Sequence, residues 1–202
     1  MSTVEKDQTI SRDSNGTLMT PEEFDAISDY DREYVYELIN GVLIVTPSPS
    51  PGERAPSDLL AQCLRNYHDN HPEGSALNLT LPEHTLSVGD NRRRADRVIW
   101  CGFNRDVDVA NDVPNIVIEM VSATRRNRKR DYQAKRRYYR ELGVQEYWIM
   151  DRFERRVAVI RLDEKAESQF LLTKSDTLTT PLLPGFELPL SRWLAEADRF
   201  SS

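Results

Sequence analysis

The sequence predicts an α/β fold, with a central mixed β-sheet flanked by helices, and three observations favour it. Residues 55–69 carry apolar side chains at spacings of three and four, which is typical of an amphipathic helix. Short runs rich in β-branched and aromatic residues follow, and these indicate strands. A second helical segment, residues 129–142, interrupts those strands, and this order is typical of a mixed α/β architecture.

The expected elements follow along the chain. Thr20-Pro21-Glu22-Glu23 is a capping residue, a proline and two acids, which predicts a helix start. Asn40-Gly41 between two β-rich runs predicts a hairpin over residues 34–46. A proline-rich loop, residues 47–52, precedes the first long helix. The remaining strands are predicted at 76–81, 84–88, 96–101, 115–121, 145–150, 155–162 and 168–173, with Gly143 ending the second long helix, a turn at Pro184-Gly185 and a last helix at 191–199.

Length and composition limit the class of protein. A chain of 202 residues suggests about one domain, and we expect a flexible tail over residues 1–18 and a single domain over 19–200. No apolar run approaches the ~20 residues of a membrane-spanning helix, and the first residues lack the apolar stretch of a secretion signal. Two cysteines exclude a disulfide framework, so we expect a reducing, cytoplasmic location.

Positive charge is concentrated in one segment of an otherwise acidic chain. Residues 125–140 hold nine Lys and Arg and one Asp, a net charge of +8, whereas the whole chain carries −6. A second basic group is Arg92-Arg93-Arg94, with Arg97 close by. Such a distribution can attract a polyanion to one place. The alternative is a solvated helix face with no binding role.

Two acidic residues stand on neighbouring predicted strands. Asp96 opens one strand, and Glu119 lies inside the apolar run Ile-Val-Ile-Glu-Met-Val. Burying an unpaired carboxylate costs several kcal/mol, so a cation, a metal ion or a raised pKa must compensate. Two carboxylates that meet on adjacent strands form a hard-oxygen site suited to Mg²⁺. Asp131 and Lys135 share one face of the following helix, which could bring Lys135 to the carboxylates.

Each of these residues also has a purely structural interpretation. Asp96 could pair with Arg94 or Arg97, and Glu119 could form a buried ion pair with an arginine. Asp131 and Lys135 could be a helix cap and an ordinary i,i+4 salt bridge. We expect the aromatic side chains nearby to pack in the core rather than to stack on bases, namely Tyr138, Tyr139 and Trp148.

An ordered set of motifs resembles the Uma-two restriction-endonuclease family, a branch of the PD-(D/E)XK nuclease superfamily. The resemblance covers roughly residues 20–195. The motifs are Tyr36-Glu37-Leu38-Ile39-Asn40-Gly41, Pro47-Ser48-Pro49-Ser50-Pro51, Ala95-Asp96-Arg97-Val98, Val117-Ile118-Glu119-Met120-Val121-Ser122, then Asp131, Lys135 and Tyr138, and finally residues 143–151 (GVQEYWIMD).

The resemblance implies a restriction-endonuclease-like core and a set of site residues. By position, Asp96 and Glu119 are the acids that bind Mg²⁺ or Mn²⁺. The superfamily's lysine usually stands where this chain has Val121, and the family implies that Lys135 replaces it. Glu37 and Asp131 are the implied accessory acids. DNA is the expected partner, contacted by Arg125, Arg126, Arg128, Lys129 and Arg130.

Three positions depart from the family pattern. Ala95 replaces the usual proline, Ser122-Ala123-Thr124 replaces Ser-Pro-Ser, and Gly52-Glu53-Arg54 stands where a histidine is common. None of these changes removes a charged residue of the expected site.

The sequence therefore predicts a metal-dependent endonuclease that hydrolyses DNA. Two other interpretations stay open. One is a catalytically inactive nuclease fold that binds DNA. The other is a protein-interaction module, such as a homodimer formed through apolar strands near residues 155–173.

Overall fold

The structure is a computed structural model that describes residues 10–122, 128–162 and 167–200, and only the backbone of residues 128–131. The chain divides into two compact units. Unit 1 comprises the chain up to Ser48 together with Thr85–Arg94, and unit 2 comprises Pro49–His84 with Ala95–Ser202. The sequence prediction of one domain over 19–200 stays a prediction.

Unit 1 is built on the predicted hairpin. β1 (Tyr34–Ile39) pairs antiparallel with β2 (Val42–Pro47). Asn40 and Gly41 form the turn with φ values of 51° and 75°, and two positive φ values are the requirement of a type I′ turn. The unit also holds η1 (Arg12–Ser14) and α1 (Pro21–Asp25).

The residues before α1 pack onto the hairpin of unit 1. The side chain of Ile10 is buried with Tyr36 and Leu43. Residues 10–18, which the sequence assigned to a tail, therefore include a buried apolar anchor, whereas residues 1–9 lie outside the described chain. The Thr20 hydroxyl accepts a hydrogen bond from the Glu23 N–H, and the Glu23 carboxylate accepts one from the Thr20 N–H, as the sequence predicted for this helix start.

Unit 2 contains a mixed sheet, which confirms the predicted fold class. Its strands follow the order β4-β5-β6-β7-β8, with β3 also paired to β4. β5 and β6 are parallel, and the other neighbours in that order are antiparallel. The bounds are β3 (Leu77–Val88), β4 (Asn91–Cys101), β5 (Ile116–Met120), β6 (Glu146–Asp151), β7 (Arg156–Leu162) and β8 (Glu167–Thr173), and β3 and β4 begin or end in unit 1.

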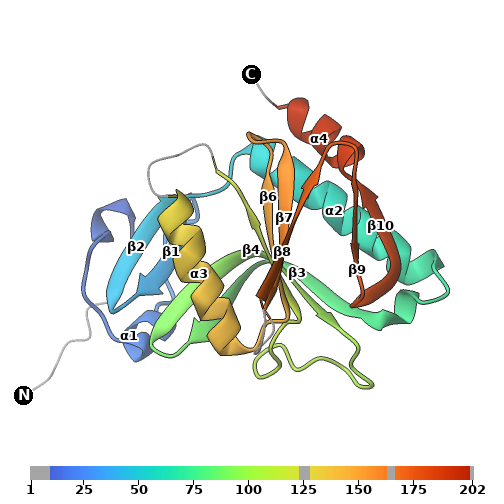
Figure 1. The fold of residues 1–202 in the computed structure, drawn as a ribbon. Helices are drawn as coiled ribbons and strands as arrows, with labels where there is room; N and C mark the ends of the chain where they lie inside the picture. Colours follow the sequence, from blue (N-terminus) through green and yellow to red (C-terminus); the bar gives the residue numbers. More distant parts are fainter. Residues whose placement is uncertain (1–9, 123–127, 163–166, 201–202) are drawn as a thin grey trace, which may run out of the picture. The chain divides into compact units, whose positions relative to one another are not determined.

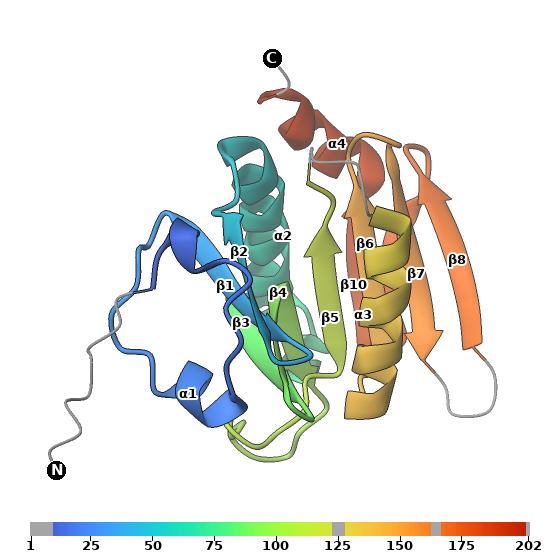
Figure 2. The same cartoon turned by 90° about the vertical axis from the view of Figure 1, so that its left-hand side faces the viewer.

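Helices cover both faces of the unit 2 sheet. α2 (Pro51–Asn70), α4 (Leu190–Asp198) and the small sheet of β9 (Thr177–Thr180) and β10 (Leu183–Pro189) pack on one face, and α3 (Arg128–Leu142) packs on the other (Figure 1). Figure 2 shows α3 alongside β6 and β7 from a second direction. The main hydrophobic core lies on the α2 side and includes Trp148, Phe186 and Trp193. The α3 side buries both aromatic and charged side chains, among them Tyr139 and Lys135.

Several predicted boundaries were wrong. The strands expected at 76–81 and 84–88 form the single strand β3, which carries one positive φ of 48° at Glu83. The expected loop over 47–52 is shorter, because α2 already begins at Pro51, a residue suited to a first helical position. Pro184-Gly185 lies inside β10 at an irregularity of its pairing with β9, not at a hairpin turn.

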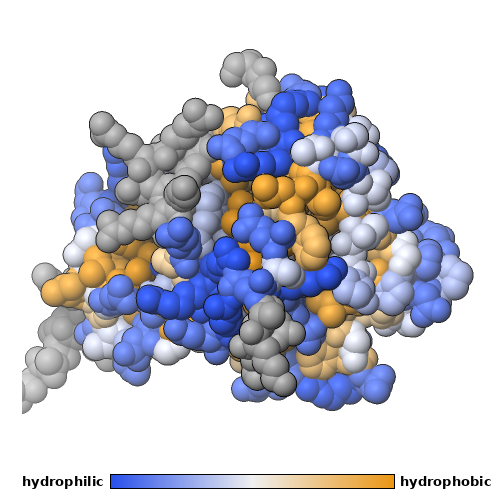
Figure 3. Space-filling model, viewed as in Figure 1, coloured by the Kyte–Doolittle hydropathy of each residue, from blue (hydrophilic) through white to orange (hydrophobic). Residues whose placement is uncertain are grey.

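The surface of β7 and β8 is partly apolar. Hydrophobic side chains show among hydrophilic ones over this region of the molecule (Figure 3), and Phe170 and Leu171 on β8 are 44% and 52% exposed. These residues lie in the segment that the sequence offered as a contact between copies of the chain. No described helix is long and apolar enough to span a membrane.

Candidate active site

Asp96 and Glu119 occupy opposite positions on β4 and β5. The two strands are antiparallel, with Arg97 paired to Ile118. One position further along each strand, Asp96 lies opposite Glu119. Residues directly opposite each other on neighbouring strands project from the same face of a sheet. Asp96 is fixed further because the Met120 N–H donates to its Oδ2 at 2.6 Å. The two carboxylates that the sequence placed on adjacent strands therefore share the face covered by α3.

Glu119 is held by two side chains from α3. Its carboxylate is buried, with 4% of the residue exposed. The Lys135 ammonium donates to Oε2 at 2.8 Å, and the Tyr139 hydroxyl donates to Oε1 at 2.6 Å. Lys135 and Tyr139 stand four residues apart, which puts both on the helix face turned to the sheet. Both oxygens of Glu119 thus have a fixed partner before any ligand binds.

The surroundings of this cluster are tightly packed. Tyr139 is fully buried and makes an edge-to-face contact with Tyr147 of β6, with ring centroids 5.0 Å apart. Lys135 is 8% exposed, so its aliphatic stem is buried together with its charge. Because these contacts limit the rotation of both α3 side chains, they also fix the orientation of the Glu119 carboxylate.

Burial raises the pKa of Glu119 to about 7. The negative charge of Asp96 raises this pKa as well, whereas the Lys135 ammonium and the Tyr139 hydroxyl lower it. Glu119 consequently changes charge near neutral pH. The negative charge of the buried Glu119 is compensated by a cation, as the sequence predicted. That cation is Lys135 rather than an arginine.

The donor set fits a divalent cation. The cluster holds the carboxylates of Asp96 and Glu119 and the Lys135 ammonium that pairs with Glu119, and carboxylate oxygens are preferred ligands of Mg²⁺ and Mn²⁺. Mg²⁺ sites often use one or two carboxylates and complete the shell with water and substrate phosphates. Among the described residues, no group of three or more His, Cys, Asp and Glu side chains is placed to hold a metal ion. Within this cluster, Asp96 and Glu119 are the residues that would supply carboxylate ligands to a metal ion.

Other predicted site residues lie elsewhere or outside the described structure. Glu37 is in unit 1, where its Oε1 accepts the Arg94 N–H at 2.9 Å. The backbone at Asp131 is helical, but its side chain is outside the described part, as are the side chains of Arg128, Lys129 and Arg130 and all of Arg125 and Arg126. Their roles stay predictions.

Sequence reasoning missed the role of Tyr139 and the burial of Arg97. The contact of Tyr139 with Glu119 could have been predicted, because Tyr139 lies one helical turn after Lys135 and so shares its helix face. Arg97 lies next to Asp96 in the sequence but points to the α2 side, where its guanidinium reaches Thr80 Oγ1 at 3.3 Å. Burial lowers its pKa. Alternation along β4 separates these two neighbours.

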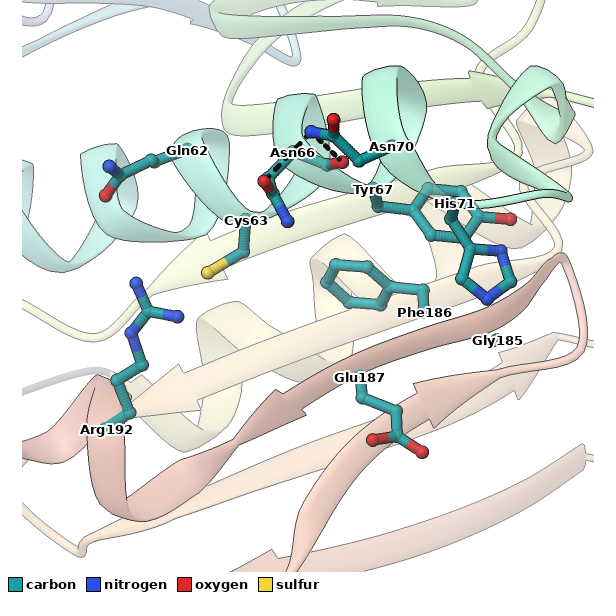
Figure 4. A pocket seen from close by; sticks show the side chains of 10 residues that line it. All are labelled: Gln62, Cys63, Asn66, Tyr67, Asn70, His71, Gly185, Phe186, Glu187 and Arg192. Atoms are coloured by element: carbon teal, nitrogen blue, oxygen red, sulfur yellow. Dashed lines mark hydrogen bonds between the residues drawn. The ribbon is translucent and has the colours of Figure 1, made fainter.

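A cavity of unit 2 lies on the face of the sheet opposite to the carboxylates. It measures about 450 Å³ and lies on the α2 side of the sheet, between α2 and β10 (Figure 4). Asn66 and Asn70 line one wall, and Arg192 lines another. Cys63 also lines it, and burial raises the pKa of this thiol. The polar side chains that surround the opening are exposed, as expected for an open groove.

Comparison with known proteins decides the family. The Uma2 family, whose description reads "Putative restriction endonuclease", matches residues 21–191. The chain belongs to the Uma2 family. This match confirms the resemblance seen in the sequence motifs and spans both units. No curated protein matches the chain.

A solved structure supports the fold. The chain is similar to "a putative nuclease belonging to DUF820" from Anabaena variabilis ATCC 29413, with a TM-score of 0.70 and 17% sequence identity. The similarity covers 89% of this Uma2 chain and 99% of the other. At that identity the likeness shows a shared fold, and the nuclease class comes from family membership.

Proposed function

We propose that this Uma2 protein is a metal-dependent endonuclease that hydrolyses phosphodiester bonds of DNA. The observation that carries the proposal is the buried Glu119 carboxylate, hydrogen-bonded by Lys135 and Tyr139 and set across from Asp96. A buried acid with a pKa near neutrality beside a lysine is typical of a functional site. Family membership supports the nuclease class.

Each residue has a distinct role in this proposal. A divalent cation bound by Asp96 and Glu119 would polarise the phosphodiester and acidify a bound water. The Lys135 ammonium stabilises negative charge that develops on the phosphoryl oxygens, or orients the attacking water. The Met120 N–H holds the Asp96 carboxylate, and the Tyr139 hydroxyl holds that of Glu119, so the two acids are oriented before substrate arrives.

The basic segment is proposed to bind the DNA backbone. Residues 125–140 lead into and form α3, the helix that also delivers Lys135. Contacts from Arg125, Arg126, Arg128, Lys129 and Arg130 to phosphates would give affinity without reading base sequence. The acidic remainder of the chain makes non-specific binding elsewhere unfavourable.

A cleavage assay tests the proposal. Supercoiled plasmid, linear duplex, single-stranded DNA and RNA are each incubated with the purified protein in Mg²⁺, in Mn²⁺ and in EDTA. We expect cleavage of DNA with either metal and none in EDTA. Asp96→Asn and Glu119→Gln should reduce the rate at least about 100-fold, because each removes a ligand charge while keeping the side-chain shape. The matched control is Glu154→Gln, an exposed acid of the β6–β7 turn.

Lys135→Met completes the set. It should reduce the metal-dependent rate while leaving a folded protein, measured by far-ultraviolet circular dichroism. Cleavage at the wild-type rate by Glu119→Gln or Lys135→Met would defeat the assignment of the site.

A second candidate is a nuclease fold that binds DNA without cleaving it. One observation favours it, because both oxygens of Glu119 are already engaged by Lys135 and Tyr139. In that case DNA binding would be independent of Mg²⁺ and weaken steeply with salt, and no product would form under any metal condition.

A further inference from the structure

A small cavity lies beyond the carboxyl end of β5, at the first turn of α2. Its volume is about 10 Å³, which is room for about one oxygen atom, and one side of it is open. Met120 at the end of β5 and the following Val121 line it, as do Gly52 and Glu53 of α2. The backbone N–H of Met120 also donates to Asp96. The cavity therefore begins one residue beyond Glu119, toward the opposite face of the sheet.

Arg152 lines this cavity, and two of its hydrogen-bond donors have no partner among the described residues. Its Nε and Nη1 are buried, and neither donates to any described acceptor. No described carboxylate lies within ion-pair distance of its guanidinium, which instead rests over the Phe153 ring at 4.6 Å. Two donors of Arg152 therefore lack a hydrogen-bond acceptor among the described residues. A buried donor left unsatisfied costs free energy.

Trp193 lines the same cavity and also has an unsatisfied donor. The residue is 1% exposed, and its indole N–H finds no acceptor among the described residues. The other two tryptophans differ, because Trp100 donates to the Asp112 carbonyl at 2.8 Å and Trp148 donates to Glu146 Oε2 at 2.9 Å. Arg152 and Trp193 come from different parts of the chain, and both residues line this one small space.

Gly52 and the positive end of α2 also favour an anion at this cavity. A Cβ at position 52 would overlap the Arg152 guanidinium, so the absence of a side chain lets the guanidinium lie against the first turn. A cation beside the positive end of a 20-residue helix is unfavourable unless an anion lies with it. The Glu53 carboxylate lies at this same helix end, and its Oε2 accepts from the Ser50 N–H and hydroxyl at 2.7 Å each.

We propose that Arg152, Trp193 and the first turn of α2 bind one phosphate of the polynucleotide substrate, with a single phosphate oxygen entering the cavity. The oxyanion site is derived from the cavity itself, and its assignment to a backbone phosphate rests on the proposed nuclease function. Arg152 and Trp193 donate to the oxygen, and the helix end stabilises its charge. Bound there, a phosphate would fix the strand relative to Asp96 and Glu119, so these residues position substrate and take no part in bond cleavage.

The indole N–H resonances test the site directly. In ¹⁵N–¹H spectra of the full chain in EDTA, the Trp193 resonance, identified with Trp193→Phe, should shift and saturate as inorganic phosphate is added. It should shift as well with a single-stranded oligonucleotide, and sodium chloride of equal ionic strength should leave it unchanged. The Trp100 and Trp148 resonances are internal controls and should stay in place. No saturable shift of Trp193 with phosphate would overturn the site, and a shift with phosphate but none with oligonucleotide would overturn its assignment to substrate.

Binding of a labelled oligonucleotide in EDTA gives the second readout. Arg152→Met should weaken binding about tenfold and lower the salt slope by about 1. The matched control is Arg155→Met, which removes an exposed arginine of the same turn. Equal affinities for Arg152→Met and wild type would overturn the proposal. Failure of the nuclease assignment looks different, because the protein would not cleave while phosphate still shifted the Trp193 resonance.

Discussion

Replacing Lys135 by methionine should destabilise the protein in a manner that depends strongly on pH. The substitution keeps most of the buried stem and removes the charge that pairs with Glu119 Oε2. Glu119 then keeps its burial and the repulsion from Asp96, both of which raise its pKa, and loses the ion pair that lowers it. Its pKa in the folded variant must therefore rise above the wild-type value of about 7.

The size of the destabilisation at each pH follows from the protonation state of Glu119. Because the folded pKa of Glu119 is raised, its contribution to stability is fully present below about pH 4.5 and is lost as pH rises through about 7. At pH 5 the folded wild type and variant both hold a neutral Glu119, so we expect their free energies of unfolding to differ by about 1 kcal/mol or less. At pH 8.5 the variant must bury an unpaired carboxylate or bind a proton, which costs about 3 kcal/mol.

Urea denaturation followed by tryptophan fluorescence at pH 5 and pH 8.5 measures both differences. Arg155→Met is the control, because it breaks an exposed pair with Asp198 that is worth at most about 1 kcal/mol. The Arg155 guanidinium keeps the Asp198 pKa below its usual value, so this control should show the same small loss at both pH values. An equal loss at pH 5 and pH 8.5 for Lys135→Met would refute the reasoning.

Three further substitutions or measurements test other parts of the structure. Tyr139→Phe removes a hydrogen bond that lowers the Glu119 pKa, so the acid limb of the cleavage pH profile should move to higher pH and the free energy of unfolding should fall by about 1–3 kcal/mol; an unchanged profile would contradict the role of Tyr139. Gly41→Ala forces a side chain to adopt φ = 75° and should cost about 1 kcal/mol in urea denaturation, whereas no loss would exclude the positive-φ turn. Burial raises the pKa of Cys101 to about 12, so its thiol should resist Ellman's reagent at pH 8 until urea unfolds the chain, and rapid reaction in the native protein would contradict its burial.

The carboxylate cluster could be predicted from the sequence because its elements are local. The apolar run around Glu119 identified a buried strand, and the spacing of Asp131 and Lys135 identified one helix face. The position of Asp96 across from Glu119 needed the strand register, which depends on tertiary pairing. The sequence also did not show which face of the sheet Asp96 occupies. Asp96 and Arg97 are consecutive on one strand and point to opposite faces, so either could have met Glu119.

The features that the sequence did not reveal arise from contacts distant along the chain. Arg152 and Trp193 line one cavity although 41 positions separate them in the numbering, and no local sequence pattern indicates that they are neighbours. The β9–β10 pair was missed because Pro184-Gly185 has the composition of a turn, whereas the structure uses the positive φ of Gly185, 79°, inside an irregular strand. The two strands predicted separately are likewise one strand, β3, which pairs with β4.

The location of bound metal tests the central proposal most directly. Crystals grown at pH 8 and soaked in Mn²⁺ would reveal the ion by its anomalous scattering. We predict one strong peak within about 2.1–2.3 Å of carboxylate oxygens of both Asp96 and Glu119, and its loss in Asp96→Asn. A Mn²⁺ ion bound elsewhere, with both carboxylates uncoordinated at saturating metal, would contradict the proposed centre.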